Sequence, residues 1–525
     1  KLDQSLSPQS YVLASYSRGA NATQYYVFKN PTDPRYDVDP KVFSEAAGYN
    51  FYVGGYQMGH YERQTVVQTW KLEYLNQVSA LHQLRMGLEH RKTGIDFTNY
   101  ATLLNETTGY LPQVPEDHTV NYDHYHRSPV EWSAYVQDKI EFSDLVVNLG
   151  LRYDAFQPNW KVLSDPADPN YRDPLKPVNQ YHDLDGDGSI SLEEMTPDNA
   201  KTEAERLQYW YKDASPKSQF SPRLAVAYPI TDKGVLHFSY GHFFQIPPFT
   251  YLYLNPDFEV TPSLSTTMGN ADLEPERTTQ YEVGVQQQIG RFVGIDVTGF
   301  YKDIRNLLGT RILDTFVAGD RYALYVNRDY GNVRGVTASV TLRRMGAVSG
   351  SLDYTFSVAE GNASDPATAY YDELSGNEPE KQLVPLDWDQ RHTLNGTVTY
   401  YWGRSGRVSL VGQYGSGLPY TPELAGTRIS FENSERKPPQ FQVDLRSSWS
   451  MSLLGLTWRW QVNVYNLFDR RNERLVYNDT GRATYSLVST YLPEQQRYNT
   501  LSEYLTRPDY YSPPREVKIG VSLDL

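Results

Sequence analysis

The residues of this sequence best suited to chemistry lie within positions 183–194, which read DLDGDGSISLEE. In an EF-hand calcium loop of twelve residues, acidic groups occupy positions 1, 3, 5 and 12, and glycine occupies position 6. The expected oxygen ligands are Asp183, Asp185, Asp187, the main-chain carbonyl of Ser189, Ser191 through a water molecule, and Glu194. Because Ca²⁺ takes several oxygen ligands, this spacing predicts one calcium site. The alternative is an acidic, glycine-rich turn without metal.

The residues beside this motif do not suit the helix pair of an EF-hand, because Pro174 and Pro177 precede it and Pro197 follows it. We therefore expect a structural calcium ion rather than a sensor. The chain contains no cysteine, so a bound metal could supply the order that disulfides give to other long loops. We treat residues 161–217 as one loop insert that contains the calcium loop 183–194.

A second group of possible metal ligands precedes Arg127. It consists of Asp117, His118, Asp123, His124 and His126. Imidazoles and carboxylates could bind a transition metal or an iron-bearing substrate. Their spacing closes no ligand set, and histidines are ordinary in loops, so we do not predict a second metal site.

Motifs of known enzyme classes are missing from the sequence. It contains no Gly-x-Ser-x-Gly, His-Glu-x-x-His or phosphate-binding loop. We expect neither catalysis nor a catalytic cofactor. The net charge of -14 argues against a nucleic-acid partner, because phosphate binding requires clustered Lys and Arg.

Along many segments of the chain, apolar and polar side chains alternate with a period of two. This pattern indicates β-strands with one apolar face. We count about sixteen such segments. Clear examples cover 147–153, 293–301, 394–402, 441–451 and 458–468. At the end of the chain, Val517, Ile519, Val521, Leu523 and Leu525 point one way, and Glu516, Lys518, Gly520, Ser522 and Asp524 point the other.

The connections between these segments are alternately short and long. Short turns lie near 79–80, 143–144, 231–234, 290–291, 344–347, 402–407 and 453–455. Long connections cover approximately 19–64, 101–127, 161–217, 245–277, 308–330, 360–389, 421–438 and 470–514. All turns therefore lie on one rim and all long loops on the other, as in outer-membrane barrels with periplasmic turns and extracellular loops.

Composition agrees with a membrane barrel. No apolar run approaches the roughly 18 residues that a membrane helix needs. The 44 Tyr and 9 Trp suit the aromatic girdles of a barrel. We predict an all-β protein, a transmembrane antiparallel β-barrel over residues 1–525, in the outer membrane of a Gram-negative bacterium. The alternative is a Tyr-rich soluble β-protein such as a propeller or lectin.

Two sets of residues could meet a substrate. The inner faces of the strands carry polar residues such as Glu282, Gln286, Asp296, Arg459, Gln461 and Asn463, which could equally contact a plug or channel water. The segment 243–253, FFQIPPFTYLY, offers aromatic rings with large contact area, although anchoring in the membrane interface explains it equally well.

Five stretches carry further motifs in chain order. They are GNADLEPERTTQYEVG at 269–284, DVTGFYKDIRN at 296–306, RHTLN at 391–395, GSGLPYTP at 415–422 and VNVYNLFD at 462–469. Together they resemble the TonB-dependent outer-membrane receptors. The third and fourth are most similar to the large receptors that carry a carboxypeptidase-regulatory-like domain before the plug. The resemblance spans essentially the whole chain.

The resemblance implies a barrel of about 22 strands around an N-terminal plug, preceded by a segment that engages TonB. The sequence shows neither plug nor coupling segment. We therefore expect this chain to be the C-terminal part of such a receptor, without roughly the first six strands. A self-contained, porin-sized barrel is the alternative. The chain also ends on Leu525, whereas such barrels usually end on an aromatic residue.

The function that the resemblance implies is a receptor and transporter that imports an extracellular ligand, whose identity the sequence does not give. Expected partners are the outer-membrane lipid, the TonB complex through an upstream plug, and the ligand; a surface lipoprotein is a further candidate. Two other functions stay open. One is a passive porin-like channel, and the other is a calcium-dependent surface adhesin or assembly partner anchored by the barrel.

Overall fold

The computed structural model describes residues 1–37, 55–104, 108–261, 264, 266–377, 382–403, 405–425, 427–453, 455–491 and 499–524. Leu525, expected to share the outward face of the last strand, lies outside these residues.

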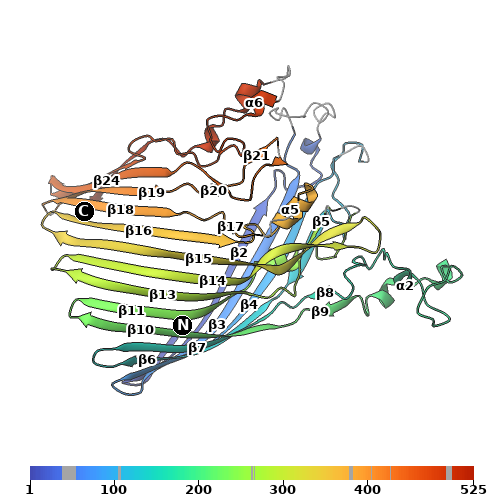
Figure 1. Ribbon diagram of the computed structural model, residues 1–525, viewed down its shortest axis with the longest axis horizontal. Coiled ribbons are helices and arrows are strands. Elements are labelled where there is room, and N and C mark those ends of the chain that lie inside the picture. Colours follow the sequence, from blue (N-terminus) through green and yellow to red (C-terminus); the bar gives the residue numbers. More distant parts are fainter. Residues whose placement is uncertain are drawn as a thin grey trace.

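A single curved antiparallel sheet forms the wall of the protein (Figure 1). Within the described residues it has sixteen strands of nine or more residues, which confirms the number expected from the alternation. They are β2 (Ser10–Tyr25), β3 (Gly59–Gln77), β4 (His82–Ala101), β6 (Val130–Glu141), β7 (Val146–Gln157), β10 (Lys217–Thr231), β11 (Gly234–Gln245), β13 (Glu276–Ile289), β14 (Val293–Asp314), β15 (Arg321–Met345), β16 (Val348–Gly361), β18 (His392–Trp402), β19 (Gly406–Gly415), β24 (Gln440–Leu453), β25 (Leu456–Tyr465) and β26 (Glu516–Asp524).

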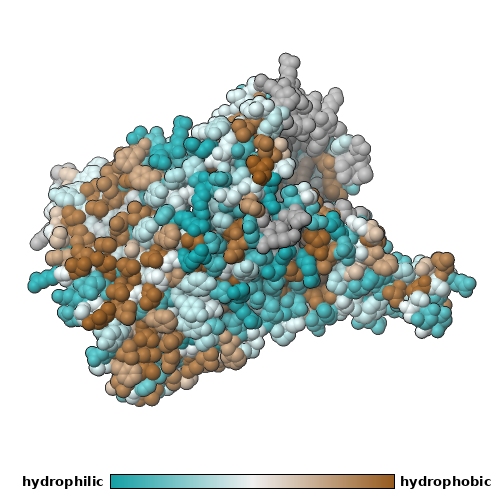
Figure 2. Space-filling view, viewed as in Figure 1, coloured by the Kyte–Doolittle hydropathy of each residue, from teal (hydrophilic) through white to brown (hydrophobic). Residues whose placement is uncertain are grey.

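The two faces of the wall have the polarity that the sequence predicted. Val517, Ile519, Val521 and Leu523 of β26 are 42–69% exposed on the outer face. Val521 pairs with Trp460 of β25, which in turn pairs with Trp449 of β24, so the apolar side chains of neighbouring strands share one face. Figure 2 shows hydrophobic residues gathered over the half of the wall nearest the short turns, with more hydrophilic residues toward the long loops.

The connections also follow the predicted alternation. Tight turns join β3 to β4, β6 to β7, β10 to β11, β13 to β14, β15 to β16, β18 to β19 and β24 to β25 at one rim. Gly290 and Gly455 in two of these turns have φ values of 60° and 78°, a left-handed conformation that glycine adopts without strain. The described parts of the long connections lie at the opposite rim (Figure 1).

The prediction of a loop at 308–330 was wrong. Strands β14 and β15 continue far beyond the rim as a two-stranded ribbon, with Leu308 paired to Asn327 and Asp314 paired to Arg321. A bulge near Asn306, whose φ is 61°, shifts the register where the ribbon begins. The bulge interrupts the regular alternation of apolar and polar residues. For this reason the outer half of the hairpin was not recognised as strand in the sequence.

Short strands organise the other long connections. They are β5 (Tyr122–Arg127), β8 (Lys161–Leu163), β9 (Tyr211–Asp213), β12 (Thr267–Met268), β17 (Val384–Pro385), β20 (Pro419–Tyr420), β21 (Glu423–Leu424), β22 (Thr427–Arg428) and β23 (Glu435–Arg436). One further short strand, β1 (Leu2–Ser7), precedes β2 and pairs with it. Strand β5 extends the wall by pairing with β4, so the end of the predicted loop 101–127 is a strand. The remaining β8–β9, β20–β23 and β21–β22 pairs form small separate ribbons.

Helices are few and short. They are η1 (Pro34–Tyr36), α2 (Pro177–Gln180), η3 (Pro197–Asn199), α3 (Glu203–Arg206), α4 (Phe249–Tyr253), α5 (Thr368–Leu374), α6 (Val488–Tyr491), α7 (Leu501–Tyr504) and η4 (Pro508–Tyr510). Among the described residues, no helix has the length and apolar character needed to cross a membrane.

The sheet is open. In the part of the chain that the structure describes, β1 pairs only with β2 at one edge, and β26 pairs only with β25 at the other. The buried apolar residues lie not inside the wall but among the long loops, where Leu252, Tyr253, Leu308 and Tyr325 belong to the largest cluster. The loop-bearing rim is therefore the packed part of the molecule.

Candidate functional site

The predicted calcium loop lies on an arm that projects from the loop-bearing rim between β7 and β10 (Figure 1). The short β8–β9 ribbon forms the base of this arm. At the base, Tyr171 and Trp210 pack with Tyr322 of β15 in a hydrophobic cluster. The indole N–H of Trp210 donates to the carbonyl of Pro169 at 3.0 Å. The arm is thus anchored to the wall, and its far end holds the loop.

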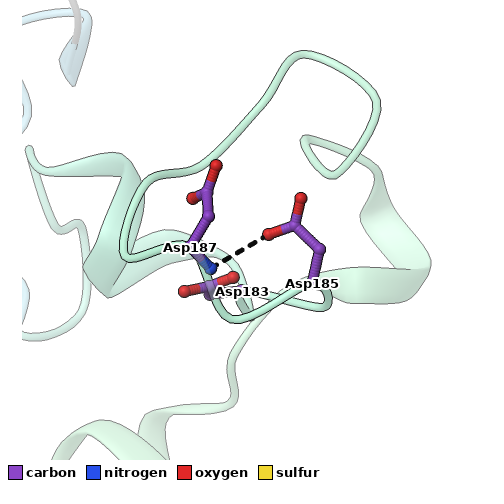
Figure 3. Close-up of side chains that lie close together, drawn as sticks. All are labelled: Asp183, Asp185 and Asp187. Atoms are coloured by element: carbon purple, nitrogen blue, oxygen red, sulfur yellow. Dashed lines mark hydrogen bonds between the residues drawn. The ribbon is translucent and has the colours of Figure 1, made fainter.

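Three of the predicted ligands come together at the end of the arm. Carboxylate oxygens of Asp183, Asp185 and Asp187 all lie within 4.8 Å of one another (Figure 3). An oxygen of Asp185 accepts the main-chain N–H of Asp187 at 3.2 Å. Both oxygens of Asp183 accept main-chain N–H groups, from Gly186 at 2.6 Å and Gly188 at 2.8 Å. These bonds wrap the chain around the carboxylates.

The last predicted ligand, Glu194, is buried beneath the loop with 6% exposure. Its Oε1 accepts the N–H of Leu184 at 2.7 Å. Its Oε2 accepts both the N–H and the hydroxyl of Ser191, at 2.8 and 2.9 Å. Glu194 therefore joins the start of the loop to position 9. Ser189 donates its hydroxyl to Asp187 at 2.7 Å, so each predicted serine contacts a predicted carboxylate.

The two ends of the loop are also held together. The side-chain amide of Asn199 donates to the carbonyls of His182 and Glu194, at 2.7 and 2.8 Å. An isolated bridge between Tyr181 and Ala200 closes the neck below them. The sequence analysis missed Asn199, because its role depends on joining the two ends of the loop, 17 and 5 positions away, and on no recognisable motif.

Hydrogen bonds keep two of these carboxyl groups acidic. Donation from the hydroxyl and N–H of Ser189 holds the pKa of Asp187 below its usual value. Donation from the N–H groups of Ser191 and Leu184 lowers the pKa of Glu194 in the same way. Both groups are therefore anionic at neutral pH, and this donor set contains only oxygen atoms. Such a set fits Ca²⁺ better than a transition metal.

The second group of possible ligands does not form one site. His118 contacts Asp257 at 3.0 Å, in the loop between β11 and β13. His124 and His126 contact Thr98 and Asp96 of the neighbouring strand, at 3.0 and 2.6 Å. These histidines thus have separate partners.

The aromatic segment 243–253 packs mainly inward. Leu252 and Tyr253 of α4 are each 1% exposed in the cluster at the rim. The hydroxyl of Tyr253 donates to the carbonyl of Pro158 at 2.7 Å. Phe243 stays 38% exposed. Most of the rings therefore stabilise the rim, and only part of the segment is free to recognise a ligand.

A cavity of about 480 Å³ lies beside this segment, at the mouth of the wall. Its polar side is formed by Glu89, Arg91, Glu131, Arg152 and Asp154 of β4, β6 and β7, and its apolar side by Phe244–Phe249. The charges are largely paired, with Arg91 at 3.1 Å from Glu89 and Arg152 at 2.8 Å from Asp154. Sequence analysis did not find this cavity, because it depends on a loop folding back over distant strands.

The family-like motifs hold the rim together. Asn270 donates to the carbonyl of Tyr325 at 3.0 Å, and a Cβ on the adjacent Gly269 would lie 2.6 Å from the main-chain nitrogen of Leu254. Asn466, with φ of 51°, donates to the carbonyls of Arg470 and Pro513, each at 3.0 Å. Close packing thus requires glycine at position 269, and the left-handed turn favours asparagine at position 466.

The wall, its two unlike rims and these motifs define an outer-membrane barrel protein. Residues 4–467 match the family model described as TonB dependent receptor-like, beta-barrel, and the chain belongs to this family. No curated protein matches the sequence. The family and the fold place the protein in the bacterial outer membrane.

Solved structures show the same fold at low sequence identity. FpvA of P. aeruginosa, solved with heterologous pyoverdines, is 11% identical with a TM-score of 0.56 over 99% of this chain and 54% of its own. BauA of Acinetobacter baumannii, a ferric preacinetobactin receptor, is 13% identical with a TM-score of 0.54 over 100% and 61%. The copper transporter OprC is 11% identical with a TM-score of 0.52 over 89% and 58%. This chain thus spans less than two thirds of each of these structures.

Proposed function

We propose that the protein is the barrel part of a TonB-dependent receptor that binds an extracellular ligand at its loop-bearing rim and imports it. The family match over residues 4–467 carries this proposal. The mouth cavity supports it, because a cavity with both charged and apolar walls suits a polar ligand with a ring or chain. The similar structures are named for pyoverdines, ferric preacinetobactin and copper, and we assign none of these ligands to this chain.

Coupling to TonB would run through a plug that belongs to the receptor outside these 525 residues. Two observations support this arrangement. The chain covers 54–61% of the similar structures, and its sheet has two unpaired edges within the described strands. Unpaired main-chain groups are costly in lipid, so further strands would close the wall.

Uptake measurements test the proposal. A strain that lacks the receptor gene should lose growth on a scarce nutrient that the complete receptor restores, and deletion of tonB should cause the same loss. Diffusion through an open channel would not require TonB. A conducting pore formed by this chain in planar bilayers, together with TonB-independent uptake, would support the porin-like alternative instead.

We further propose that residues 183–194 bind one structural Ca²⁺ that stiffens the arm. Wild-type protein should then resist protease cleavage within 161–217 in Ca²⁺ and lose this resistance in chelator. The double variant Asp187→Ala with Glu194→Ala should be cleaved rapidly in both conditions. The matched control is Glu193→Ala with Asp198→Ala, which removes two nearby acids outside the ligand positions. Equal cleavage of the wild type with and without chelator would exclude the site.

The arm also keeps the adhesin or assembly hypothesis open, since it projects from the rim (Figure 1). A surface lipoprotein or another cell-surface partner would contact the arm in that case. Deleting residues 164–209 in the complete receptor should then abolish partner binding while uptake continues. Loss of uptake would instead assign the arm to ligand capture.

A further inference from the structure

The outer face of β2, β3, β4 and β6 carries three parallel rows of side chains of different chemistry. The strand register aligns Ala14, Leu72, Leu88 and Ala134 in the row nearest the short turns. Two residues further toward the long loops, it aligns Tyr16, Trp70, His90 and Trp132. The third row contains Arg18, Gln68 and Lys92. No register shift interrupts these pairings, so the rows lie directly above one another.

The first row lies in an apolar groove. Cavities of about 460 and 480 Å³ share Leu72 and Leu88, and they run from Ala14 across to Phe220. Leu72 is 46% exposed and Leu88 is 58% exposed. Small side chains such as Ala134 leave the depression between larger neighbours. Its largely apolar lining suits a hydrocarbon chain lying against the wall.

The aromatic row forms a continuous ledge at one end of the groove. Ring centroids are 5.2 Å apart for Tyr16 and Trp70, 5.2 Å for Trp70 and His90, and 3.9 Å for His90 and Trp132. The amide of Gln68 donates to the hydroxyl of Tyr16 at 3.3 Å, which joins this ledge to the third row. Trp and Tyr rings of this kind mark the level of lipid headgroups.

The cations of the third row lack counter-charges. Arg18 and Lys92 are exposed, and within the described residues neither makes an ion pair. The next row outward, Ala20, Val66 and Gly94, carries no acid. By contrast, cations on the inner face of the same strands are paired, with Lys71 and Arg85 each 3.2 Å from Glu73. Two cations on the outer face are thus available to an external anion.

We propose that this surface binds a phosphate-bearing lipid of the outer leaflet. The acyl chain lies in the groove, the aromatic ledge meets the interface, and Arg18 and Lys92 contact the phosphate-containing headgroup. Strands β2 and β4 flank β3, so the two cations are attached to strands about 10 Å apart, a span that a large headgroup can bridge. The loop-side position of the cations places the headgroup at the external surface.

Native mass spectrometry of the detergent-purified protein tests this site with two lipid probes, anionic phosphatidylglycerol and zwitterionic phosphatidylcholine. Two cations near a membrane surface should favour the anionic lipid by about thirtyfold. The double variant Arg18→Gln with Lys92→Gln should bind the two lipids within about threefold of each other. The matched control, Arg291→Gln with Arg343→Gln, removes the same charge near the opposite rim and should keep the wild-type preference.

A second variant tests the groove separately. Ala134→Trp fills the depression without changing charge, so binding of both lipids should weaken. Millimolar inorganic phosphate should not displace the lipid, because a free anion lacks the acyl chain. An unchanged preference in the Arg18 and Lys92 variant, or complete displacement by inorganic phosphate, would overturn the proposal.

Discussion

The hydroxyl of Tyr322 donates a hydrogen bond of 2.7 Å to the main-chain carbonyl of Pro166, a residue 156 positions earlier in the chain. Tyr322 is fully buried in the extended part of β15, and Pro166 lies at the base of the arm. This contact connects the arm to the most extended hairpin of the rim. The arm therefore has a fixed base, although its tip is far from the wall.

Tyr322→Phe should loosen this base. The substitution keeps the ring but leaves the Pro166 carbonyl without its donor, which costs about 1–3 kcal/mol for a buried group. We expect faster protease cleavage within 161–217 at a constant Ca²⁺ concentration. The control is Tyr209→Phe in the same arm, because Tyr209 is 43% exposed and its hydroxyl has no hydrogen-bond partner within the described residues. Equal cleavage of the two variants would contradict the assigned role.

Glu259 should make the rim sensitive to pH. Burial raises the pKa of Glu259 to about 7, and the amide of Asn170 on the arm donates to its Oε2 at 2.5 Å. The folded protein therefore retains a proton that the unfolded chain releases near pH 4.5. This contribution to stability is complete below about pH 4.5 and is lost as the pH rises through about 7.

Thermal unfolding between pH 5 and 8 measures this effect. The wild type should lose stability toward pH 8, and Glu259→Gln, which is neutral at every pH, should lose less. Glu203→Gln on the exposed side of the arm serves as the control and should keep the wild-type slope. A slope that persists unchanged in Glu259→Gln would assign the pH dependence to other groups.

The wall could be predicted from the sequence because its signal is local. Lipid on one side and water on the other impose a period of two on every strand, so Val517, Ile519 and Val521 reveal their face without knowledge of any partner. The number of strands and the alternation of turns and loops follow from the same pattern. The calcium loop could also be proposed, because its three aspartates lie within five residues.

The rim could not be predicted in the same way, because its packing joins distant segments. The inward position of Tyr253 depends on Pro158, which is 95 residues away. The ribbon beyond Asn306 depends on a bulge that breaks the alternation. His118 and His126 looked like neighbours in sequence, yet each pairs with an acid on a different element. Such contacts produce no periodic pattern of residue types in the sequence.

Asp389 should be essential for the stability of the connection between β16 and β18. Its side chain is completely buried, and it accepts the N–H of Ala359 and the Nε of Arg391, each at 2.8 Å. It also pairs with Arg436. Asp389→Asn leaves the partly buried guanidinium of Arg436 without this counter-charge and leaves Arg391 with the more distant Glu360, at 3.7 Å, which should cost about 3 kcal/mol.

The temperature at which the folded band disappears on a semi-native gel measures this loss. Asp387→Asn provides the control, since Asp387 is exposed and accepts one hydrogen bond, from Asn433 at 2.8 Å. This variant should unfold within a few degrees of the wild type. A comparable loss in both variants would show that the local charge, rather than the buried pairing, matters.

Calcium protection of the arm should persist into mildly acidic solution. Ca²⁺ requires ionised ligands, and the hydrogen bonds in the loop hold the pKa values of Asp187 and Glu194 below their usual range. These two carboxylates therefore stay charged as the pH falls from 7.5 to about 5, and protection should be lost only at pH values near or below about 4. Proteolysis of the arm across this range, at fixed free Ca²⁺, provides the measurement.

Asp187→Asn should weaken the apparent affinity of the loop for Ca²⁺ several-fold, whereas Glu193→Gln should not. Loss of protection between pH 6 and 7 in the wild type would indicate a histidine ligand instead of the carboxylate set.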